Sequence, residues 1–171
     1  MRPVHREPCG PGQESVWDYP RPPRVEVARR RVRVADRDGT LLGEAPAGSG
    51  RAWRVLETSH PPTYYLARSV VDPRRVRAND DRSWCEFKGE AVYHDVLDAQ
   101  GRVLLPSAAW TYPLPHADYA PLAGAFAFYP GRLVCHLDDE LVRPQAGGFY
   151  GGWITDDVVG PFKGEHGTHG W

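Results

Sequence analysis

The sequence predicts a mainly β protein, with antiparallel strands, an extended segment at each end and few short helices. The chain of 171 residues contains 18 glycines and 17 prolines, which interrupt long helices and supply turns. Its 6 tryptophans, 8 tyrosines and 5 phenylalanines favour strands and can line pockets. Apolar side chains also alternate with polar ones in several short segments, which is the pattern of a strand with one buried face.

The length is that of a single domain, which composition divides into three parts. Residues 1–24 end in the prolines of VWDYPRPPR and predict an extended arm, whose Trp17 and Tyr19 we expect to dock on the body. Residues 25–143 form the expected core. Residues 144–171 combine eight glycines with five bulky aromatic residues, so we expect this tail to pack closely on the core.

The first strands follow the arm. Alternating valines within residues 25–34 predict strands, and Asp38-Gly39 predicts a hairpin turn before Leu41 and Leu42. Residues 52–58 predict either a strand or one helical turn.

The middle of the chain holds the clearest strand pair. After the double proline at 61–62, residues 63–67 predict another extended run, whereas residues 70–82 predict a polar excursion. In residues 84–97 alternate side chains fall on opposite faces, and Lys88-Gly89 lies at or near the bend.

Short elements complete the core. Residues 102–106 predict a short strand, residues 108–115 a proline-bounded aromatic segment, and residues 116–124 a brief helix. Residues 124–142 predict a hairpin that turns at Pro130-Gly131.

Charge and cysteine content narrow the function classes. The 21 Lys and Arg residues balance 22 Asp and Glu residues, and the net charge of -1 disfavours nucleic acid and anionic membrane as partners. Cys9, Cys85 and Cys135 do not form a disulfide framework pattern and fit free thiols in a reducing compartment. No apolar run reaches the roughly 20 residues that span a bilayer, and the start of the chain lacks the apolar core of a signal peptide. We therefore expect a cytoplasmic monomer or homodimer whose partner is a small molecule.

Familiar site motifs are absent from the sequence. There is no Cys-x-x-Cys, and His166 with His169 is the only close histidine pair, so we expect no structural zinc and predict no firm cofactor. The nucleophile-elbow, phosphate-loop and dinucleotide-binding glycine motifs are also missing. The common hydrolase, NTPase and dinucleotide-binding folds are therefore not supported.

Lys88 is the first candidate for chemistry. Gly89 permits a positive φ and a close approach of the main chain, and Cys85, Glu86 and Glu90 flank the lysine. A lysine held in this way can bind a phosphate or carboxylate, or act as a base if burial lowers its pKa. The alternative is a solvated turn lysine beside two glutamates.

The element Phe-Lys-Gly-Glu at residues 87–90 recurs at residues 162–165. Lys163 is the weaker candidate because it stands alone in the glycine-rich tail, which we expect to cover the rim of the same pocket. Cys85 becomes a reactive thiolate if a cation lies nearby, whereas a buried cysteine is usually an inert small hydrophobe. Cys135 fits the inert role.

Residues 57–69 form a second candidate cluster. Glu57 and His60 precede a rigid double proline, and Tyr64 and Tyr65 then point to opposite faces. A carboxylate, an imidazole and a phenol on one stiff loop suit acid-base catalysis or recognition of a polar ligand. In the alternative, Glu57 caps main-chain amides, His60 is exposed and one tyrosine packs in the core.

Four further aromatic residues, Trp110, Tyr112, Phe128 and Tyr129, recur at strand spacing in the second half of the chain. Core packing explains most aromatic residues in such strands. A small sheet cannot bury so many rings completely, so an aromatic-walled pocket is expected.

Six segments in order carry a resemblance to a known family. They are WDYPRPPRVE, RVLETSHPPTYYLA, WCEFKGEAVYHDV, AAWTYPLP, PLAGAFAFYPGR and PQAGGFYGGWITDDVVGPFKG. From Trp17 onward the chain closely resembles the bacterial domain of unknown function 427, also catalogued as nucleotidyltransferase family 9. The resemblance implies a single compact antiparallel fold of the β-tent type, similar to zinc-bearing methionine sulfoxide reductases and the drug-binding domain of cereblon. Zinc is not carried over, because the cysteine pairs of those relatives are absent here.

The resemblance also marks individual positions. They are Glu57, Pro61, Pro62, Tyr64, Tyr65, Cys85, Phe87, Lys88, Gly89, Tyr93, Trp110, Tyr112, Phe128 and Tyr129. This sequence departs from the family pattern at Glu86, where proline often stands, and at His94, where an aromatic residue is frequent. Both departures put a further titratable group beside Lys88.

The catalogue label implies nucleotidyl transfer, which normally uses paired carboxylates to hold Mg²⁺ around a triphosphate. Asp80-Asp81, Asp138-Asp139 and Asp156-Asp157 are candidate pairs. Adjacent residues of a strand face opposite ways, so no pair compels this chemistry. Magnesium is expected only if the chain is such a transferase.

The leading hypothesis is a domain that binds a small polar or anionic ligand in an aromatic-lined pocket at a sheet rim. If it is an enzyme, the candidate catalytic residues are Glu57, Lys88, Cys85 and Tyr65, with Lys88 as the positive charge and Glu57 as the acid-base group. The candidate ligand-binding residues are Tyr64, Tyr93, Trp110, Tyr112, Phe128 and Tyr129. The alternatives are a Mg-dependent nucleotidyltransferase and a non-catalytic structural or partner-binding subunit.

Overall fold

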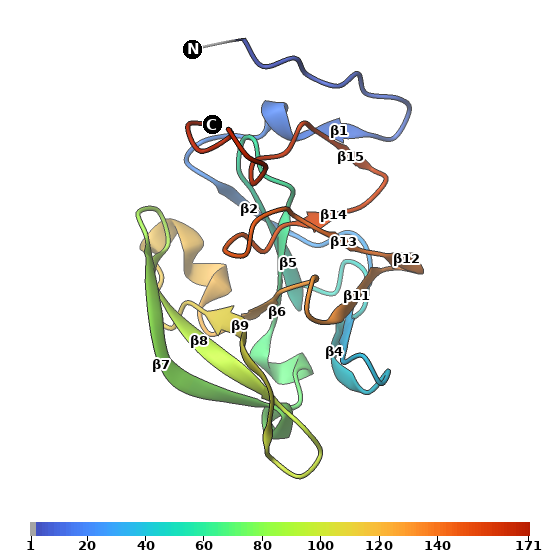
Figure 1. Ribbon diagram of the computed structural model, residues 1–171. Coiled ribbons are helices and arrows are strands. Elements are labelled where there is room, and N and C mark those ends of the chain that lie inside the picture. The colour runs from blue at the N-terminus through green and yellow to red at the C-terminus, as the bar shows by residue number, and fades with distance from the viewer. Residues whose placement is uncertain (1–2) are drawn as a thin grey trace.

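The computed structural model describes residues 3–171 as a mainly β protein with two main antiparallel sheets and a few short 3-10 helices (Figure 1). The larger sheet has seven strands, and all neighbouring strands in it are antiparallel. In spatial order they are β2 (Arg24–Val27), β5 (Ala52–Leu56), β6 (Thr63–Leu66), β10 (Phe126–Phe128), β9 (Val103–Thr111), β8 (Gly89–Leu97) and β7 (Val76–Cys85).

The smaller main sheet has four strands and packs on one face of the larger one. In spatial order they are β12 (Glu140–Leu141), β11 (Val134–Leu137), β3 (Val32–Ala35) and β4 (Leu41–Ala45). Two short pairs involve the chain ends: β1 (Glu14–Ser15) with β15 (Val158–Val159), and β13 (Arg143–Pro144) with β14 (Trp153–Ile154). The 3-10 helices are η1 (Val16–Asp18), η2 (Arg68–Val70), η3 (Pro73–Arg75) and η4 (Ala117–Leu122).

Several predicted elements are confirmed. β3 and β4 form the hairpin expected around Asp38-Gly39, and β7 and β8 form the pair that bends at residues 86–88. Residues 52–56 are a strand and not a helical turn, and the brief helix expected at 116–124 is η4. The mainly antiparallel β class is therefore as predicted.

The prediction of a polar excursion at 70–82 is wrong, because most of this segment belongs to strand β7. β7 is an edge strand that pairs with β8 alone, and most of its side chains are exposed. Main-chain hydrogen bonds hold such a strand without an apolar face, and charged side chains are common on sheet edges. The pattern of apolar residues therefore gave no signal for it.

The prediction of a hairpin at 124–142 is also wrong. β10 is bonded by β6 on one edge and by β9 on the other, so it has no free edge for β11. The turn at Pro130-Gly131 instead carries the chain into the smaller sheet, where β11 pairs with β3 and β12.

The alternation of side chains divides the buried residues of the large sheet between its two faces. One face, which includes Tyr64, Leu66 and Phe128, shares a buried cluster with Val34 and Leu42 of the smaller sheet. The other face carries a second cluster rich in aromatic residues, which η4 partly covers. No helix among residues 3–171 is long and apolar enough to cross a bilayer.

The arm and the tail lie side by side at one end of the molecule (Figure 1). Val16 in the arm is fully buried with Leu56 and Val158. The indole of Trp17 donates a hydrogen bond of 2.8 Å to the main-chain oxygen of Pro161. Trp153 in the tail is 1% exposed and donates to the main-chain oxygen of Phe128 at 3.2 Å. Both ends thus pack on the body.

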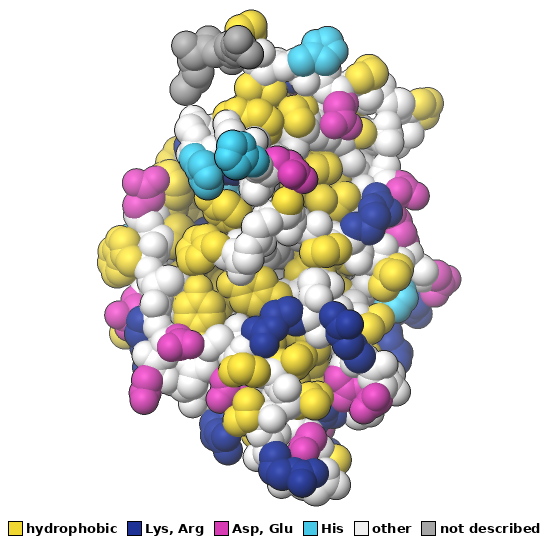
Figure 2. All heavy atoms as spheres, in the orientation of Figure 1, with side chains coloured by type: hydrophobic (Ala, Val, Ile, Leu, Met, Phe, Trp, Pro, Cys, Tyr) yellow, Lys and Arg dark blue, Asp and Glu magenta, His cyan; other side chains and the backbone are white. Residues whose placement is uncertain are grey.

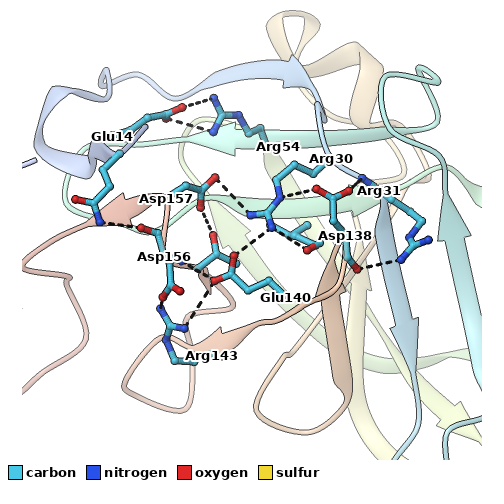
Figure 3. A network of polar contacts seen from close by, with 12 residues as sticks. Glu14, Arg30, Arg31, Arg54, Asp138, Glu140, Arg143, Asp156 and Asp157 are labelled. Carbon is cyan, nitrogen blue, oxygen red and sulfur yellow. Dashed lines mark hydrogen bonds and ion pairs between the residues drawn. The ribbon is translucent and has the colours of Figure 1, made fainter. Parts of the chain in front are cut away.

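A network of ion pairs joins the tail to the smaller sheet (Figure 3). Arg30 contacts Asp138 at 3.0 Å, Glu140 at 3.1 Å and Asp157 at 3.5 Å. The main-chain N–H of Arg31 and the Arg30 guanidinium outweigh burial and lower the pKa of Asp138 below its ordinary value of 3.8.

The arm has a comparable contact, in which Glu14 meets Arg54 at 3.1 Å (Figure 3). Burial opposes ionisation of Glu14, but hydrogen bonds from Arg54 and Tyr19 outweigh it and lower the pKa below 4.5. The folded state therefore prefers both Glu14 and Asp138 as anions.

These lowered pKa values predict a loss of stability in acid. A carboxyl group whose pKa is lower in the folded state stabilises it fully above the unfolded-state pKa, and this contribution is lost as pH falls through the folded pKa. Thermal melts from pH 7 to pH 3 should show the melting temperature falling below about pH 4.5, the ordinary value for Glu14. Arg30→Met should make the acid fall shallower than in the wild type. An equal fall in both proteins would contradict the role of this network.

Arg75 and Asp36 form a second ion pair, which is buried. Their side chains are 7% and 5% exposed and meet at 2.7 Å. Arg75 also donates to the main-chain oxygen of Leu97 at 2.6 Å, and Asp36 accepts from the main-chain N–H groups of Asp38 and Thr40. The pair therefore fixes the β3–β4 turn against the large sheet.

Arg75→Met should destabilise the fold by about 3 to 5 kcal/mol, because it leaves the Asp36 carboxylate buried without its cation. Urea unfolding monitored by tryptophan fluorescence measures this loss. The neighbouring Arg74→Met is the control, because Arg74 pairs with Asp72 on the surface and its side chain is 87% exposed. Similar unfolding midpoints for the two variants would overturn the assignment.

Candidate functional site

A row of side chains crosses the face of the large sheet that the smaller sheet does not cover. Trp53 of β5 pairs with Tyr65 of β6, and Tyr65 pairs with Ala127 of β10. Ala127 in turn pairs with Trp110 of β9, and Trp110 with Tyr93 of β8. Directly paired residues of neighbouring strands lie on the same face, so the row forms a continuous floor. The small Ala127 in the centre of the row is fully buried.

The larger rings on this face of the sheet contact each other. Trp110 donates a hydrogen bond from Nε1 to the Tyr65 hydroxyl at 3.3 Å. The Trp110 ring also lies 4.7 Å from that of Tyr129, and the Tyr65 ring 6.3 Å from that of Tyr112, between centroids. Burial is the main reason why the pKa values of Tyr65, Tyr112 and Tyr129 are raised above the ordinary value of 10. Their hydroxyl groups therefore stay protonated near neutral pH and can donate hydrogen bonds.

Above this floor is a pocket of about 420 Å³, within the range of small-molecule sites. The β7–β8 tip contributes residues 83–88 to its wall, and the tail contributes residues 149–151 and Lys163. Figure 2 shows hydrophobic side chains gathered left of the centre of this face, beside the β7–β8 tip of Figure 1. The pocket thus combines an aromatic lining with polar groups from distant parts of the chain.

Lys88 reaches into this pocket from the tip. The turn is held by Phe87, whose main-chain oxygen lies 2.7 Å from His116 Nδ1, and by the main-chain bond from His116 to Lys88. Gly89 follows with a φ of 106°, a conformation that residues other than glycine rarely adopt. The Lys88 residue is only 8% exposed, and its Nζ lies 5.7 Å from the centroid of the Tyr112 ring.

The ammonium group of Lys88 lies over the Tyr112 ring but has no polar partner among residues 3–171. Within residues 3–171 its Nζ makes no hydrogen bond or ion pair, and neither does the Tyr112 hydroxyl make a hydrogen bond. In the same residues, Arg31 Nε is the fully covered side-chain atom that lacks a hydrogen-bond partner, although it lies 3.7 Å from Glu44. Lys88 Nζ and the Tyr112 hydroxyl are therefore open to the pocket and free to bind a ligand.

Glu57 lines the same pocket, so the structure brings together the two residues that the sequence placed at its centre. No ion pair joins Glu57 to Lys88. Glu57 instead lies 3.4 Å from Arg21 Nε in the arm, and its side chain is 22% exposed. The Glu57 carboxylate thus has an oppositely charged partner, whereas the Lys88 ammonium group has an aromatic ring as its neighbour and no carboxylate partner among residues 3–171.

His60 also lines the pocket and is partly buried, so the alternative of an exposed histidine is wrong. Burial is the largest cause of its lowered pKa, and the nearby Glu57 only partly offsets it. Its Nδ1 lies 3.0 Å from the main-chain oxygen of Thr58. His60 is therefore a neutral ring at neutral pH.

The other predicted site residues divide between the two faces. Tyr65, Cys85, Tyr93, Trp110, Tyr112 and Tyr129 line the pocket. Tyr64 and Phe128 do not reach it, because they point into the core between the two sheets. Burial there raises the pKa of Tyr64 to about 12. Cys135 is buried in the same core, and its pKa is raised by burial, as expected for an inert thiol.

The second Phe-Lys-Gly-Glu copy brings Lys163 to the pocket as well. The chain has two lysines, Lys88 and Lys163, and both line this one pocket. Lys163 Nζ donates to the main-chain oxygen of Trp171 at 3.0 Å and lies 5.7 Å from the Tyr150 ring centroid. The tail thus supplies part of the pocket lining through Lys163.

Sequence reasoning did not select several lining residues, among them Thr63, Ser83, Gln145, Phe149 and Tyr150. Ser83 contacts the Tyr93 hydroxyl at 3.0 Å, and Gln145 donates to the main-chain oxygen of Lys163 at 2.7 Å. The glycine pairs around Phe149 and Tyr150 were a usable signal, because they permit close packing of the tail. Nothing in the local pattern marks Ser83 or Gln145.

The candidate aspartate pairs lie outside the pocket lining. Asp138 and Asp156 contact Arg30 and Arg143, respectively, and Asp81 accepts a hydrogen bond from Ser107. Among residues 3–171, no three His, Cys, Asp or Glu side chains are placed together to hold a metal ion.

Gly151 allows the tail to close on the pocket wall. A Cβ atom at this position would overlap the Trp110 ring. Gly151→Ala should therefore push the tail off Trp110 and destabilise the fold by about 1 to 3 kcal/mol. Urea unfolding and near-ultraviolet circular dichroism of the tryptophans measure the change. Gly148→Ala is the matched control, because its Cβ would meet no atom within 4 Å; equal effects of the two substitutions would refute this contact.

Comparison with protein-family models supports the resemblance found in the sequence. Residues 24–142 match the model of the domain of unknown function DUF427, catalogued as NTP_transf_9. A comparison with curated proteins finds no match. The matched range contains the arm-proximal strands, the β7–β8 hairpin with Lys88 and the aromatic floor. The chain belongs to the DUF427 family.

Proposed function

We propose that this protein binds a small organic acid, with a carboxylate or phosphate group against Lys88 and the rest of the molecule against the aromatic floor. The observation that carries the proposal is Lys88, a residue that is 8% exposed and whose ammonium group lies in the pocket with no hydrogen bond or ion pair among residues 3–171. A buried charge without a partner is costly, and an anionic ligand relieves that cost.

The electrostatics of the pocket support an anion. Glu57 is already paired with Arg21, and Glu86 is exposed, so neither neutralises Lys88. Lys163 adds a second positive charge, which is met by a main-chain oxygen and an aromatic ring. The hydroxyl group of Tyr112 supplies a neutral donor beside Lys88. Together these groups can bind an acidic head by one charge-assisted and one neutral hydrogen bond.

The proposal is for binding without turnover. Glu57, the predicted acid-base group, is ion-paired with Arg21 of the arm. Cys85 lines the pocket and has no hydrogen-bond partner among residues 3–171. Neither arrangement specifies a reaction. We further propose, from the sequence resemblance, that the sheets are of the β-tent type and that the ligand is a cytoplasmic metabolite.

Lys88→Met tests the proposal with benzoate, phenyl phosphate and inorganic phosphate as probes. Isothermal titration should show at least one probe binding the wild type about tenfold or more tightly than the variant, because a hydrogen bond to a charged group is lost. The melting temperature without probe should not fall, because the substitution removes a buried unpaired charge. Arg77→Met, which removes an exposed positive charge outside the pocket, should bind like the wild type.

Two results would overturn the proposal. One is equal binding of the probes by Lys88→Met and the wild type, and the other is no binding of any probe by the wild type. Probe recovered unchanged after incubation supports binding without turnover. Magnesium-dependent consumption of a nucleoside triphosphate that Lys88→Met abolishes would instead support the transferase alternative.

A further inference from the structure

The three cysteines of the chain have different surroundings. Cys9 is exposed in the arm, and Cys135 is 1% exposed in the core between the two sheets. Cys85 is partly exposed, lines the pocket and has no hydrogen-bond partner among residues 3–171. Cys85 is therefore the thiol that a molecule in the pocket can reach.

The register of β7 and β8 places Cys85 on the pocket side of the sheet. Cys85 is paired with Gly89 across the hairpin. Ser83 and Tyr93 lie an even number of residues from this pair, so they share its face, and both line the pocket. Lys88, directly before Gly89, lines the same pocket. The thiol and the ammonium group thus reach the pocket from one tight turn.

The charges around the thiol favour an approaching anion. The Lys88 ammonium group lies 5.7 Å from the centroid of the Tyr112 ring and has no polar partner among residues 3–171. The carboxylates of the lining are Glu57, which pairs with Arg21, and Glu86, which is exposed and screened by solvent. Reactive cysteines are typically partly exposed and beside a cation, whereas buried cysteines are inert.

The lining suits a disulfide in size and in chemistry. The pocket volume of about 420 Å³ is within the range for small-molecule ligands. Cys85 packs against the buried aromatic cluster that includes Tyr65 and Trp110. Divalent sulfur makes favourable contacts with aromatic rings. A disulfide that carries an acid group can therefore place the acid at Lys88 and its sulfur atoms at the rings beside Cys85.

We propose that Cys85 is a modification site, at which small disulfides that carry a carboxylate form a mixed disulfide with the protein. This inference rests on the proposed function, because the acid group of the disulfide occupies the place of the acid ligand at Lys88. The deprotonated sulfur of Cys85 attacks one sulfur of the disulfide, and a new S–S bond forms as the old one breaks. The released thiolate takes up the proton that Cys85 lost. Cys85 is oxidised and the released half is reduced, once per protein molecule and without turnover.

Three disulfides of similar length test the charge preference in the wild type. They are dithiodipropionate, which is anionic, hydroxyethyl disulfide, which is neutral, and cystamine, which is cationic. Peptide mass spectrometry measures the rates of modification of Cys85 and Cys9 in the same sample at neutral pH. The ratio of the two rates removes the intrinsic reactivity of each disulfide. This ratio should be about tenfold or more higher for dithiodipropionate than for hydroxyethyl disulfide, and lowest for cystamine, because the ammonium group attracts the acid and repels the amine.

Lys88→Met should lower the preference of Cys85 for the anionic over the neutral disulfide about tenfold, because the charge that attracts the acid is lost. The control is Arg82→Met, which removes a positive charge from the same strand but outside the pocket lining. The Arg82 side chain is 42% exposed, and its variant should keep the wild-type preference. Melting temperatures check that both variants fold, and the comparison within the wild type depends on neither of them.

The outcomes separate this inference from the proposed function. Equal charge preferences at Cys85 and Cys9, no reaction of Cys85 with any disulfide, or an unchanged preference in folded Lys88→Met would each refute the modification site. The proposed function would stand if the acid probes still bound in a Lys88-dependent way. An acid probe that binds should also slow the modification of Cys85 and not that of Cys9; binding without this protection would refute the inference alone. If no acid probe binds and Cys85 shows no preference, both fail.

Discussion

The pocket depends on one packing constraint, which is that the seven-stranded sheet has two apolar faces but the smaller sheet covers just one of them. On the covered face, Tyr64 and Phe128 take part in an ordinary core. On the other face, η4, the arm and the glycine-rich tail have to provide the cover, and none of them is a second sheet. Such a cover is incomplete, so buried aromatic side chains border on open space. An aromatic floor with an accessible polar group follows from this imbalance.

Local sequence patterns predicted many of the strands but not their order. The hairpin of β3 and β4 and that of β7 and β8 follow from turn residues and alternation, which act over a few positions. The insertion of β10 between β6 and β9 joins segments about 60 and 20 residues apart along the chain, and no local pattern specifies such a pairing. The same limit explains the mistaken hairpin at 124–142. Strand β7 was missed for another reason, which is that its mostly exposed side chains give no apolar pattern.

The candidate site was predictable to a similar degree. Alternation indicated that Tyr64 and Tyr65 point to opposite faces, but it cannot say which face the second sheet covers. Lys88 and Glu57 were found because a charged residue beside a glycine or proline turn is conspicuous. The ion pair between Glu57 and Arg21 was not predicted, because Arg21 lies in the arm. The contributions of Ser83 and Gln145 to the pocket arise from tertiary packing alone. The family match over residues 24–142 includes Glu57, Ser83 and Lys88 but not Arg21 or Gln145, and it does not specify their chemistry.

The placement of both lysines in one pocket has a consequence beyond ligand binding. The remaining basic side chains that carry a fixed positive charge are arginines, which do not react as amines at neutral pH. Reactive acyl compounds that acetylate or succinylate lysines would therefore find all of their lysine targets on this protein in the lining of one pocket. Acylation neutralises the lysine charge, so it would change the electrostatics of this pocket and leave the arginines unmodified.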